Sequence, residues 1–383
     1  MNRLFLLLVI ISCMPFYLSA QNEQKPIMII KKHKAAVQSL AFSPDSKYLA
    51  SGSEDKTAVI WDLQTFEPFK TFPDHFSTVK VVIFTPDQQY IITSGDNTFK
   101  RWSLNGGTNS VYTGNPTYLW SLSVTKDSKF ITGGSFDKIV KIWELEKGAK
   151  SIRTLNGHEK SALVARFSLD GKYILTGSLD RSIRLWKADS GKLVRVYPGH
   201  GGNIYDIEFS PDGKFFASAS EDRSIRIWKT DDEKSIKTLI GHEGYVVSLA
   251  YTPDGRFLVS GSWDNSVKIW EISTGKCIYS YLDHSDKVNA VAVSPDGTMF
   301  ASASSDKIIM IWDLKCHPVV DYYFSKEVKA ELDESPLFKP KEKGEKKEIY
   351  AKRLVDSQKF KEEIYRKYYQ KYLVMTQSKD GGQ

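Results

Sequence analysis

Short segments in which apolar and polar residues alternate recur along most of the chain. A representative unit contains such segments at residues 203–210, 215–220, 224–228 and 235–239. Pro211-Asp212-Gly213 separates the first two segments, and this sequence is typical of a tight turn. Alternation with a period of two predicts half-buried strands, so we expect each unit to fold as four short antiparallel strands.

The strand pattern repeats with a period near 42 residues, and each unit carries the same polar residues. An aspartate precedes a tryptophan by six residues in seven units. A histidine lies upstream of each pair except in the third unit, where Asn115 takes its place; the steps between these positions are 42, 40, 43, 42, 42 and 42 residues. The pairs are Asp55/Trp61, Asp96/Trp102, Asp137/Trp143, Asp180/Trp186, Asp222/Trp228, Asp264/Trp270 and Asp306/Trp312, and the histidines are His33, His75, His158, His200, His242 and His284. Because one small sheet cannot bury both of its faces, the units are expected to stack and close into a ring.

A hydroxyl residue completes the repeated set. It stands four residues before the aspartate in five units, at Ser51, Thr176, Ser218, Ser260 and Ser302. With these motifs, residues 26–315 resemble the WD-repeat β-propeller family, of which the G-protein beta subunit is the familiar member. The resemblance implies an all-β, seven-bladed β-propeller of four-stranded antiparallel blades. In each blade the tryptophan, hydroxyl, histidine and aspartate should form one chain of hydrogen bonds, which avoids a cost of about 1–3 kcal/mol for each buried group left without a partner.

Two units depart from the pattern. Thr93 stands one residue too close to Asp96, whereas Thr132 stands one residue too far from Asp137. The third unit also has Asn115-Pro116 where the others have a histidine motif. Blades two and three are therefore expected to be the least regular.

The last unit lacks an obvious fourth strand after Trp312-Asp313. Residues 26–30 read Pro-Ile-Met-Ile-Ile and precede the first histidine in the way that an outer strand precedes the other units. An N-terminal latch strand is therefore expected to complete the seventh blade and close the ring.

The repeat ends near Lys315, and the rest of the chain has a different composition. Residues 316–345 contain Pro318, Pro336 and Pro340 and are expected to form a connector, followed by a charged helix at 346–375 and a flexible tail at 376–383. Apolar residues fall largely on one side of the helix: Tyr350, Leu354, Phe360, Ile364, Tyr368 and Tyr372. This helical arm either makes a second partner contact or self-associates, or it folds onto the base of the propeller.

The N-terminal segment has the features of a secretory signal peptide. Arg3 precedes an apolar run at residues 4–11, and Leu18-Ser19-Ala20 offers a cleavage site before Gln21. We expect residues 1–20 to be removed and the mature protein to be periplasmic or secreted, without a membrane span. A membrane anchor, or a lipoprotein attached through Cys13, is the alternative.

Charge and cysteine content limit the chemistry. The chain has 53 Lys and Arg against 46 Asp and Glu, a formal net charge of +7, which is weak evidence for nucleic acid, and we expect none as a partner. Neither a Gly-rich phosphate loop nor a zinc-spaced Cys/His cluster occurs, so no cofactor or metal is expected. Cys277 either pairs with Cys316 or both remain thiols; Cys316 next to His317 is better explained as a linker than as a nucleophile and its base.

Two tryptophans, Trp120 and Trp263, lie outside the repeated positions. The resemblance implies that these places, and the equivalent places in other units, line the top face around the central opening. The predicted partner-binding residues there are Lys80, Tyr118, Trp120, Phe136, Leu163, Leu179, Tyr205, Glu221, Tyr245, Trp263 and Lys287. Exposed aromatic residues at this density are typical of binding hot spots. In the alternative, these side chains pack against one another across the opening or under the C-terminal arm.

The sequence is best interpreted as a non-catalytic, extracytoplasmic scaffold that binds a protein or peptide on the top face. A propeller enzyme, either a hydrolase or a lyase, is the second hypothesis, because fold alone does not decide function. Against it, the repeats account for six of the seven histidines, and the top face offers only Glu54 and Glu221 as carboxylates. An envelope structural component that binds glycan through the aromatic residues is the third.

Overall fold

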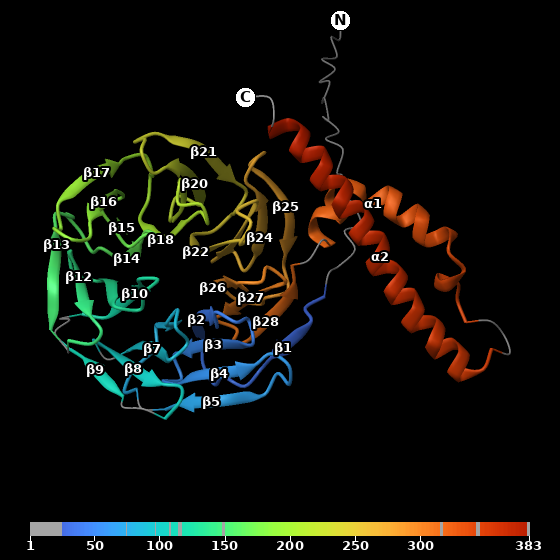
Figure 1. Cartoon of the computed structure of the whole chain (residues 1–383), viewed down its shortest axis with the longest axis horizontal. Helices are drawn as coiled ribbons and strands as arrows, with labels where there is room; N and C mark the ends of the chain where they lie inside the picture. Colours follow the sequence, from blue (N-terminus) through green and yellow to red (C-terminus); the bar gives the residue numbers. More distant parts are fainter. Residues whose placement is uncertain are drawn as a thin grey trace, which may run out of the picture.

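The computed structural model describes residues 25–73, 75–95, 97–106, 109–113, 117–147, 150–314, 317–341 and 345–380. In these residues seven four-stranded antiparallel sheets are arranged around a central opening, and a pair of helices follows them (Figure 1). The seven-bladed propeller with a C-terminal helical arm is therefore confirmed. The signal peptide expected at residues 1–20, with Cys13, lies outside the described residues.

Each blade is formed by four strands that follow one another in the chain, except the seventh. Blades one and two contain β2 (Val37–Phe42), β3 (Tyr48–Ser53), β4 (Ala58–Asp62) and β5 (Pro68–Phe72), then β6 (Val81–Phe84), β7 (Tyr90–Gly95), β8 (Thr98–Ser103) and β9 (Ser110–Tyr112). Blades three and four contain β10 (Leu119–Val124), β11 (Phe130–Ser135), β12 (Ile139–Glu144) and β13 (Ser151–Asn156), then β14 (Val164–Phe167), β15 (Tyr173–Gly177), β16 (Ile183–Lys187) and β17 (Leu193–Tyr197). Blades five and six contain β18 (Ile204–Phe209), β19 (Phe215–Ser220), β20 (Ser224–Lys229) and β21 (Ser235–Ile240), then β22 (Val246–Tyr251), β23 (Phe257–Ser262), β24 (Val267–Glu271) and β25 (Lys276–Tyr281).

The seventh blade joins the two ends of the ring. It contains β26 (Val288–Val293), β27 (Met299–Ser304) and β28 (Ile309–Asp313), and its outer strand is β1 (Met28–Ile30). β1 pairs antiparallel with β28, with Ile30 opposite Ile309. The N-terminal strand thus lies at the edge of the last sheet, while its importance for closing the ring stays a prediction.

The hydrophobic core is divided among the contacts between adjacent blades. One layer, for example, combines Ala217 and Ile225 of blade five with Leu249 and Leu258 of blade six. Small residues allow the blades to approach closely: a Cβ atom added to Gly134 would stand 2.2 Å from the Leu163 carbonyl oxygen of the next blade. Each sheet therefore buries both faces only because it has a neighbour on each side.

The antiparallel order of the strands also decides which loops share a face. The loops that precede the first strand and follow the second strand of each blade lie on one side of the ring, which is the top face. The turns between first and second strands, such as the one at Pro211, lie on the opposite side. All predicted binding residues belong to the top face or to the upper ends of the inner strands.

The C-terminal segment differs from the prediction in its helix content. Residues 316–345, expected to be a connector, contain α1 (His317–Glu334) and a short 3-10 helix, η1 (Pro336–Phe338). Val320, Phe324 and Val328 recur every four residues and form a buried face of α1, and Pro318 is compatible with a helix because it lies in the first turn. The predicted helix is α2 (Lys347–Asp380), which extends into the segment expected to be a tail.

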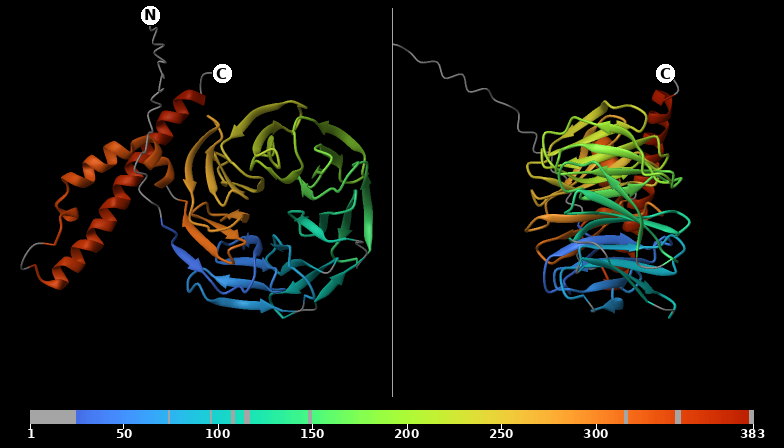
Figure 2. Two further views of the ribbon diagram at one scale, coloured as in Figure 1. Left: turned by 180° about the vertical axis from the view of Figure 1, so that it is seen from behind. Right: turned by 90° about the vertical axis from the view of Figure 1, so that its left-hand side faces the viewer.

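The two helices form a hairpin at the edge of the ring, next to blades six and seven (Figure 2). Phe324 of α1 and Tyr365, Tyr368 and Tyr372 of α2 share one buried cluster with residues of blades six and seven, including Tyr279. In both face-on views the central opening is free of helices. The arm therefore packs beside the propeller and does not cover the aromatic residues of the top face.

Candidate functional site

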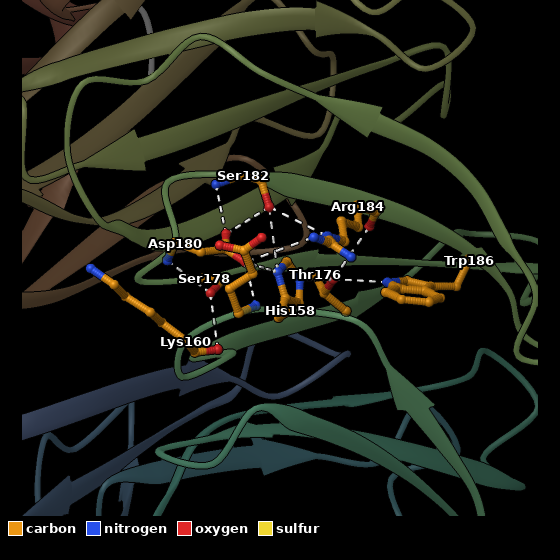
Figure 3. Close-up of polar contacts among 9 residues, drawn as sticks. His158, Lys160, Thr176, Ser178, Asp180, Ser182, Arg184 and Trp186 are labelled. Carbon is orange, nitrogen blue, oxygen red and sulfur yellow. Dashed lines mark hydrogen bonds and ion pairs between the residues drawn. The ribbon is translucent and has the colours of Figure 1, made fainter.

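The repeated polar residues form the expected chain of contacts (Figure 3). In blade four, Trp186 Nε1 donates to Thr176 Oγ1 at 2.9 Å, and this hydroxyl lies 2.7 Å from His158 Nε2. His158 Nδ1 lies 2.8 Å from Asp180 Oδ2, which also accepts the backbone N–H of Glu159 at 3.0 Å. Equivalent contacts of 2.7–3.0 Å occur in blades one, five, six and seven.

The surroundings of this set shift the pKa of several of its aspartates and of two of its histidines. Burial acts to raise the pKa of Asp180, but hydrogen bonds from His158 and Ser182 outweigh it and hold the pKa well below its ordinary value. Burial lowers the pKa of His200 and His242, more than their aspartate partners raise it. These histidines are committed to the blade interiors, which leaves them poorly placed for acid–base chemistry at the surface.

Blades two and three differ from the others, as their sequences indicate. In blade two, Thr93 still accepts from Trp102 Nε1 at 2.8 Å and contacts His75 at 2.8 Å; Asp96 lies outside the described residues. In blade three, Thr132 Oγ1 donates to the Lys141 carbonyl oxygen at 2.9 Å. Trp143 Nε1 is consequently buried without a hydrogen-bond partner among the described residues. The one-residue displacement of Thr132 thus breaks the chain of contacts.

The predicted aromatic residues come together on the top face. Trp120, on the first strand of blade three, packs edge-on against Phe136 with ring centres 5.5 Å apart, and its ring centre lies 6.4 Å from that of Tyr205 in blade five. Tyr205 continues to Trp263 at 5.7 Å, and Trp263 to Tyr245 at 5.3 Å, both in blade six. The five rings form one connected arc, called here the aromatic arc, and each remains partly exposed.

Other predicted residues take different positions. Leu163 of blade four is 1% exposed, so it lies beneath the surface and is not available for contact, contrary to its place in the predicted set. Tyr118 is 47% exposed beside Phe136, whose backbone N–H donates to the Tyr118 carbonyl oxygen. Leu179 is half-buried and its backbone pairs with Ser161. Glu221 accepts the backbone N–H of Asn203 at 3.2 Å, and its hydrogen bond with Tyr245 raises the pKa of that phenol.

Both predicted lysines lie over tryptophan rings of the aromatic arc. Lys80 Nζ is 3.8 Å from the ring centre of Trp120, and Lys287 Nζ is 4.9 Å from that of Trp263. Lys80 also donates to Gln38 Oε1 at 2.5 Å, and Gln38 donates to Glu54 at 2.8 Å. Burial lowers the pKa of Lys80 to about 8, although the charge of Glu54 acts to raise it.

These residues surround the mouth of a cavity of about 600 Å³ that continues into the central channel. Deeper in the channel, Arg166 donates to Asp206 at 3.0 Å and lies 3.5 Å from Glu208. Asp206 accepts the backbone N–H of Leu249 in the next blade at 2.9 Å. Burial raises the pKa of Glu208 to about 7, against the opposing charge of Arg166.

The Arg166–Asp206–Glu208 cluster is not among the site residues predicted from the sequence. A signal was present in the alignment of the repeats, because Asp206 occupies a position that is serine in three other blades. Those serines also accept a backbone N–H of the following blade, at 2.9–3.0 Å; they are Ser39, Ser121 and Ser248. Asp206 therefore joins blades five and six and at the same time fixes the guanidinium of Arg166.

Within the described ranges, no group of three or more His, Cys, Asp and Glu side chains is arranged to hold a metal ion. Cys277 lies partly buried on β25 and contacts the Tyr279 carbonyl oxygen at 3.2 Å, while Cys316, its predicted alternative partner, lies outside the described residues. Among the helices that the structure describes, none is both long and apolar enough to cross a membrane.

Comparison with known proteins gives a consistent result. The family model "WD domain, G-beta repeat" matches seven times, at residues 24–62, 66–103, 106–144, 149–187, 191–229, 233–271 and 275–313. Among curated proteins, the chain is 32% identical over 139 residues to apoptotic protease-activating factor 1 of Rattus norvegicus. It is 31% identical over 144 residues to the B-type cell cycle switch protein ccs52B of Medicago truncatula, and 30% identical over 149 residues to the WD repeat-containing protein srw1 of Schizosaccharomyces pombe.

The shared regions are short compared with the complete proteins. They cover 36–37% of this chain and 11%, 29% and 26% of the three relatives, respectively. The matched regions therefore extend over less than a third of each of these three relatives.

Proposed function

The chain belongs to the family of WD-repeat proteins, and from that premise we propose that it is a non-catalytic scaffold that binds a protein or peptide partner on its top face. The observation that carries the proposal is the aromatic arc of Trp120, Phe136, Tyr205, Tyr245 and Trp263. Partly exposed aromatic side chains provide large contact areas and are enriched among the residues that dominate binding energy.

Contacts within the arc favour binding because they hold the rings in place before a partner arrives. Trp263, for example, is fixed by Tyr205 and Tyr245 on one side and by the ammonium group of Lys287 on the other. Ordering a free side chain on association costs about 0.5–1.5 kcal/mol, and a fixed ring avoids most of this cost. The same contacts also fit the alternative that the rings serve only to pack the top face, and experiment separates the two.

A catalytic function is less well supported. The histidines of the repeated polar set contact hydroxyl and carboxylate groups inside the blades. Glu54 accepts a hydrogen bond from Gln38, and Glu221 accepts one from the Asn203 backbone. Screening the purified protein against peptides and glycans tests this part of the proposal. Turnover that is abolished by Glu221→Gln would establish an enzyme instead, and retention on purified cell wall would favour a glycan-binding envelope component.

An extracytoplasmic location is a further part of the proposal, and it rests on the sequence of residues 1–20. N-terminal sequencing of the protein recovered from fractionated cells tests it. A mature chain that begins at Gln21 in a periplasmic or secreted fraction is the expected result. A lipid-modified chain beginning at Cys13 would replace secretion with membrane attachment, and an intact Met1 in the cytosolic fraction would remove this part of the proposal.

Crosslinking in cells tests partner binding directly. A photoreactive amino acid replaces Trp263 on the top face, and in a matched variant it replaces Leu169, which is 53% exposed in a turn on the opposite face. We expect the first variant to capture a defined protein and the second to capture none of it. Equal capture by both positions, or capture at Leu169 alone, would contradict a top-face binding site.

A further inference from the structure

The two halves of the channel mouth differ in chemistry. The aromatic arc occupies blades three, five and six, whereas the opposite side, in blades seven, one and two, is polar. The polar side carries Lys287, Asn289, Gln38, Glu54 and Lys80, and these residues line the same cavity as Trp120, Tyr205 and Trp263. A ligand in the mouth therefore meets aromatic rings on one side and polar groups on the other, and Lys80 and Lys287 lie where the two sides meet, over Trp120 and Trp263.

The polar side carries more positive than negative charge. The Lys80 ammonium uses one of its three N–H groups on Gln38, and among the described residues neither Lys80 nor Lys287 has a carboxylate within ion-pair distance. The Asn289 amide is already engaged with the Val37 carbonyl oxygen and Ser305, both at 3.0 Å. Glu54 is the only carboxylate of this group, and it accepts from Gln38, so two ammonium groups face one carboxylate.

We propose that the mouth recognises a peptide segment in which an acidic side chain lies next to a large apolar one. The carboxylate accepts hydrogen bonds from Lys80 and Lys287, and the apolar side chain packs on Tyr205 and Trp263. This inference rests on the proposed function and adds the chemistry of the partner. Charge-assisted hydrogen bonds to a carboxylate are among the stronger ones available to a protein surface, and here they form beside rings that partly exclude water.

The environment of Lys80 gives independent support. Its ammonium is partly buried and lies against Trp120, with Gln38 as its hydrogen-bond partner. Burial without a full counter-charge lowers the pKa of Lys80 to about 8. A carboxylate that binds beside it would therefore stabilise the charged form of its ammonium group. Lys287 is exposed and therefore contributes mainly by attracting the acidic side chain.

Selection of peptides is a direct test, with a phage-displayed random peptide library as the probe and the purified chain as the target. Selected sequences are synthesised in pairs, once as found and once with Asp and Glu replaced by Asn and Gln. Binding is measured to the unaltered chain and to Lys80→Met, Lys287→Met and Trp263→Ala variants. Lys214→Met, in an exposed turn on the opposite face, serves as the matched control.

The expected peptides contain adjacent acidic and apolar residues. Their affinity should fall about tenfold on acid-to-amide replacement and about tenfold for Lys80→Met, with a similar or smaller loss for Lys287→Met and no loss for Lys214→Met. Affinity should also weaken between pH 7 and 9 in the unaltered chain, as Lys80 loses its proton, and this pH dependence should disappear in Lys80→Met.

The remaining outcomes separate the inference from the proposed function. Some peptides could require Trp263 for binding and yet bind equally well after Asp and Glu are replaced by Asn and Gln. This result would support the top-face scaffold but overturn the recognition of an acidic side chain. Equal binding of polyglutamate, which has no apolar residue, would overturn the paired recognition. The absence of any peptide that depends on Trp263 or on the lysines would count against both the inference and peptide binding at this face.

Discussion

The hydroxyl of Tyr372 on α2 donates to the carboxylate of Glu271, the last residue of β24 in blade six. Tyr323 of α1 donates to the other carboxylate oxygen at 2.7 Å. Glu271 is 1% exposed, so one buried carboxylate connects both helices to the propeller. Burial, together with these bonds to Glu271, raises the pKa of both phenols above the ordinary value, so they remain neutral donors.

Removing one of these donors should loosen the arm without unfolding the ring. Tyr372→Phe keeps the apolar packing but deprives the buried Glu271 of a hydrogen bond, which is expected to cost about 1–3 kcal/mol of docking free energy. Hydrogen exchange of α2 should become faster while that of the blades stays unchanged. Tyr350→Phe, on the part of α2 beyond the shared cluster, is the control, and equal exchange in the two variants would show that Glu271 does not hold the arm.

Acid should destabilise the ring in two pH ranges. Burial lowers the pKa of His200 and His242, so below about pH 6.5 the unfolded chain binds protons that the folded chain does not, and folding stability falls as the pH falls. Although burial acts to raise the pKa of Asp180, Asp222 and Asp264, hydrogen bonds in the folded state hold it below its ordinary value. The ionised aspartates therefore stabilise the folded state above about pH 4, and this stabilisation is lost on further acidification. Melting temperatures measured from pH 8 to pH 3 should decrease in both ranges. An increase from pH 7 to pH 5 would show that the histidines take up protons in the folded state.

The two tryptophans Trp143 and Trp186 offer a matched comparison. Both are buried, but Trp186 donates to Thr176, whereas Trp143 has no acceptor among the described residues. Replacement by Phe reduces volume equally in both blades, but only Trp186→Phe also breaks a hydrogen bond. Chemical denaturation should therefore show Trp186→Phe to be more destabilising by about 0.5–1.5 kcal/mol. Equal losses would mean that Trp143 has a partner after all.

The latch strand can be tested with two neighbouring isoleucines. Ile30 is 4% exposed and packs in the layer between blades one and seven, whereas Ile29 is 42% exposed on the same strand. Ile30→Asp buries a charge and should lower the melting temperature of the whole ring, as should deletion of residues 26–31. Ile29→Asp should have little effect. If the deletion variant melts like the unaltered chain, β1 does not contribute to closure.

Binding and folding should separate at the aromatic arc. Trp120→Ala and Trp263→Ala remove partly exposed rings, so each should weaken partner binding at least tenfold and shift the melting temperature only slightly. Trp228→Ala removes a fully buried ring and should cost about 3–5 kcal/mol of stability. Parallel binding and thermal unfolding measurements provide the check; loss of stability in the arc variants comparable to Trp228→Ala would assign the arc to packing alone.

The ring could be predicted from the sequence because particular residues recur at a fixed spacing in every repeat. An aspartate six residues before a tryptophan identifies each of the seven blades, and an upstream histidine marks all but the third. The structure brings these residues together as expected in blades one, four, five, six and seven. The failure in blade three was also visible, since a displacement of Thr132 by one residue turns its hydroxyl toward the Lys141 carbonyl oxygen.

The errors arose where a residue depends on its neighbours in space. Leu163 has the same place in its repeat as Trp120 and Tyr205, but it lies beneath the surface instead of joining the arc. Asp206 was overlooked because a contact between blades has no signature within one repeat. The helix α1 was not predicted, because Pro318 and the mixed charges are typical of a connector, whereas the apolar spacing from Val320 to Val328 that forms its buried face is short.

The pairing of Ile30 with Ile309 also has a consequence for the order of events during synthesis. Among the described strands of the propeller β1 is synthesised first and its partner β28 last, so the seventh sheet stays incomplete until the whole ring has been translated. Until then β1 has no partner strand, and an unpaired strand edge can associate with another chain.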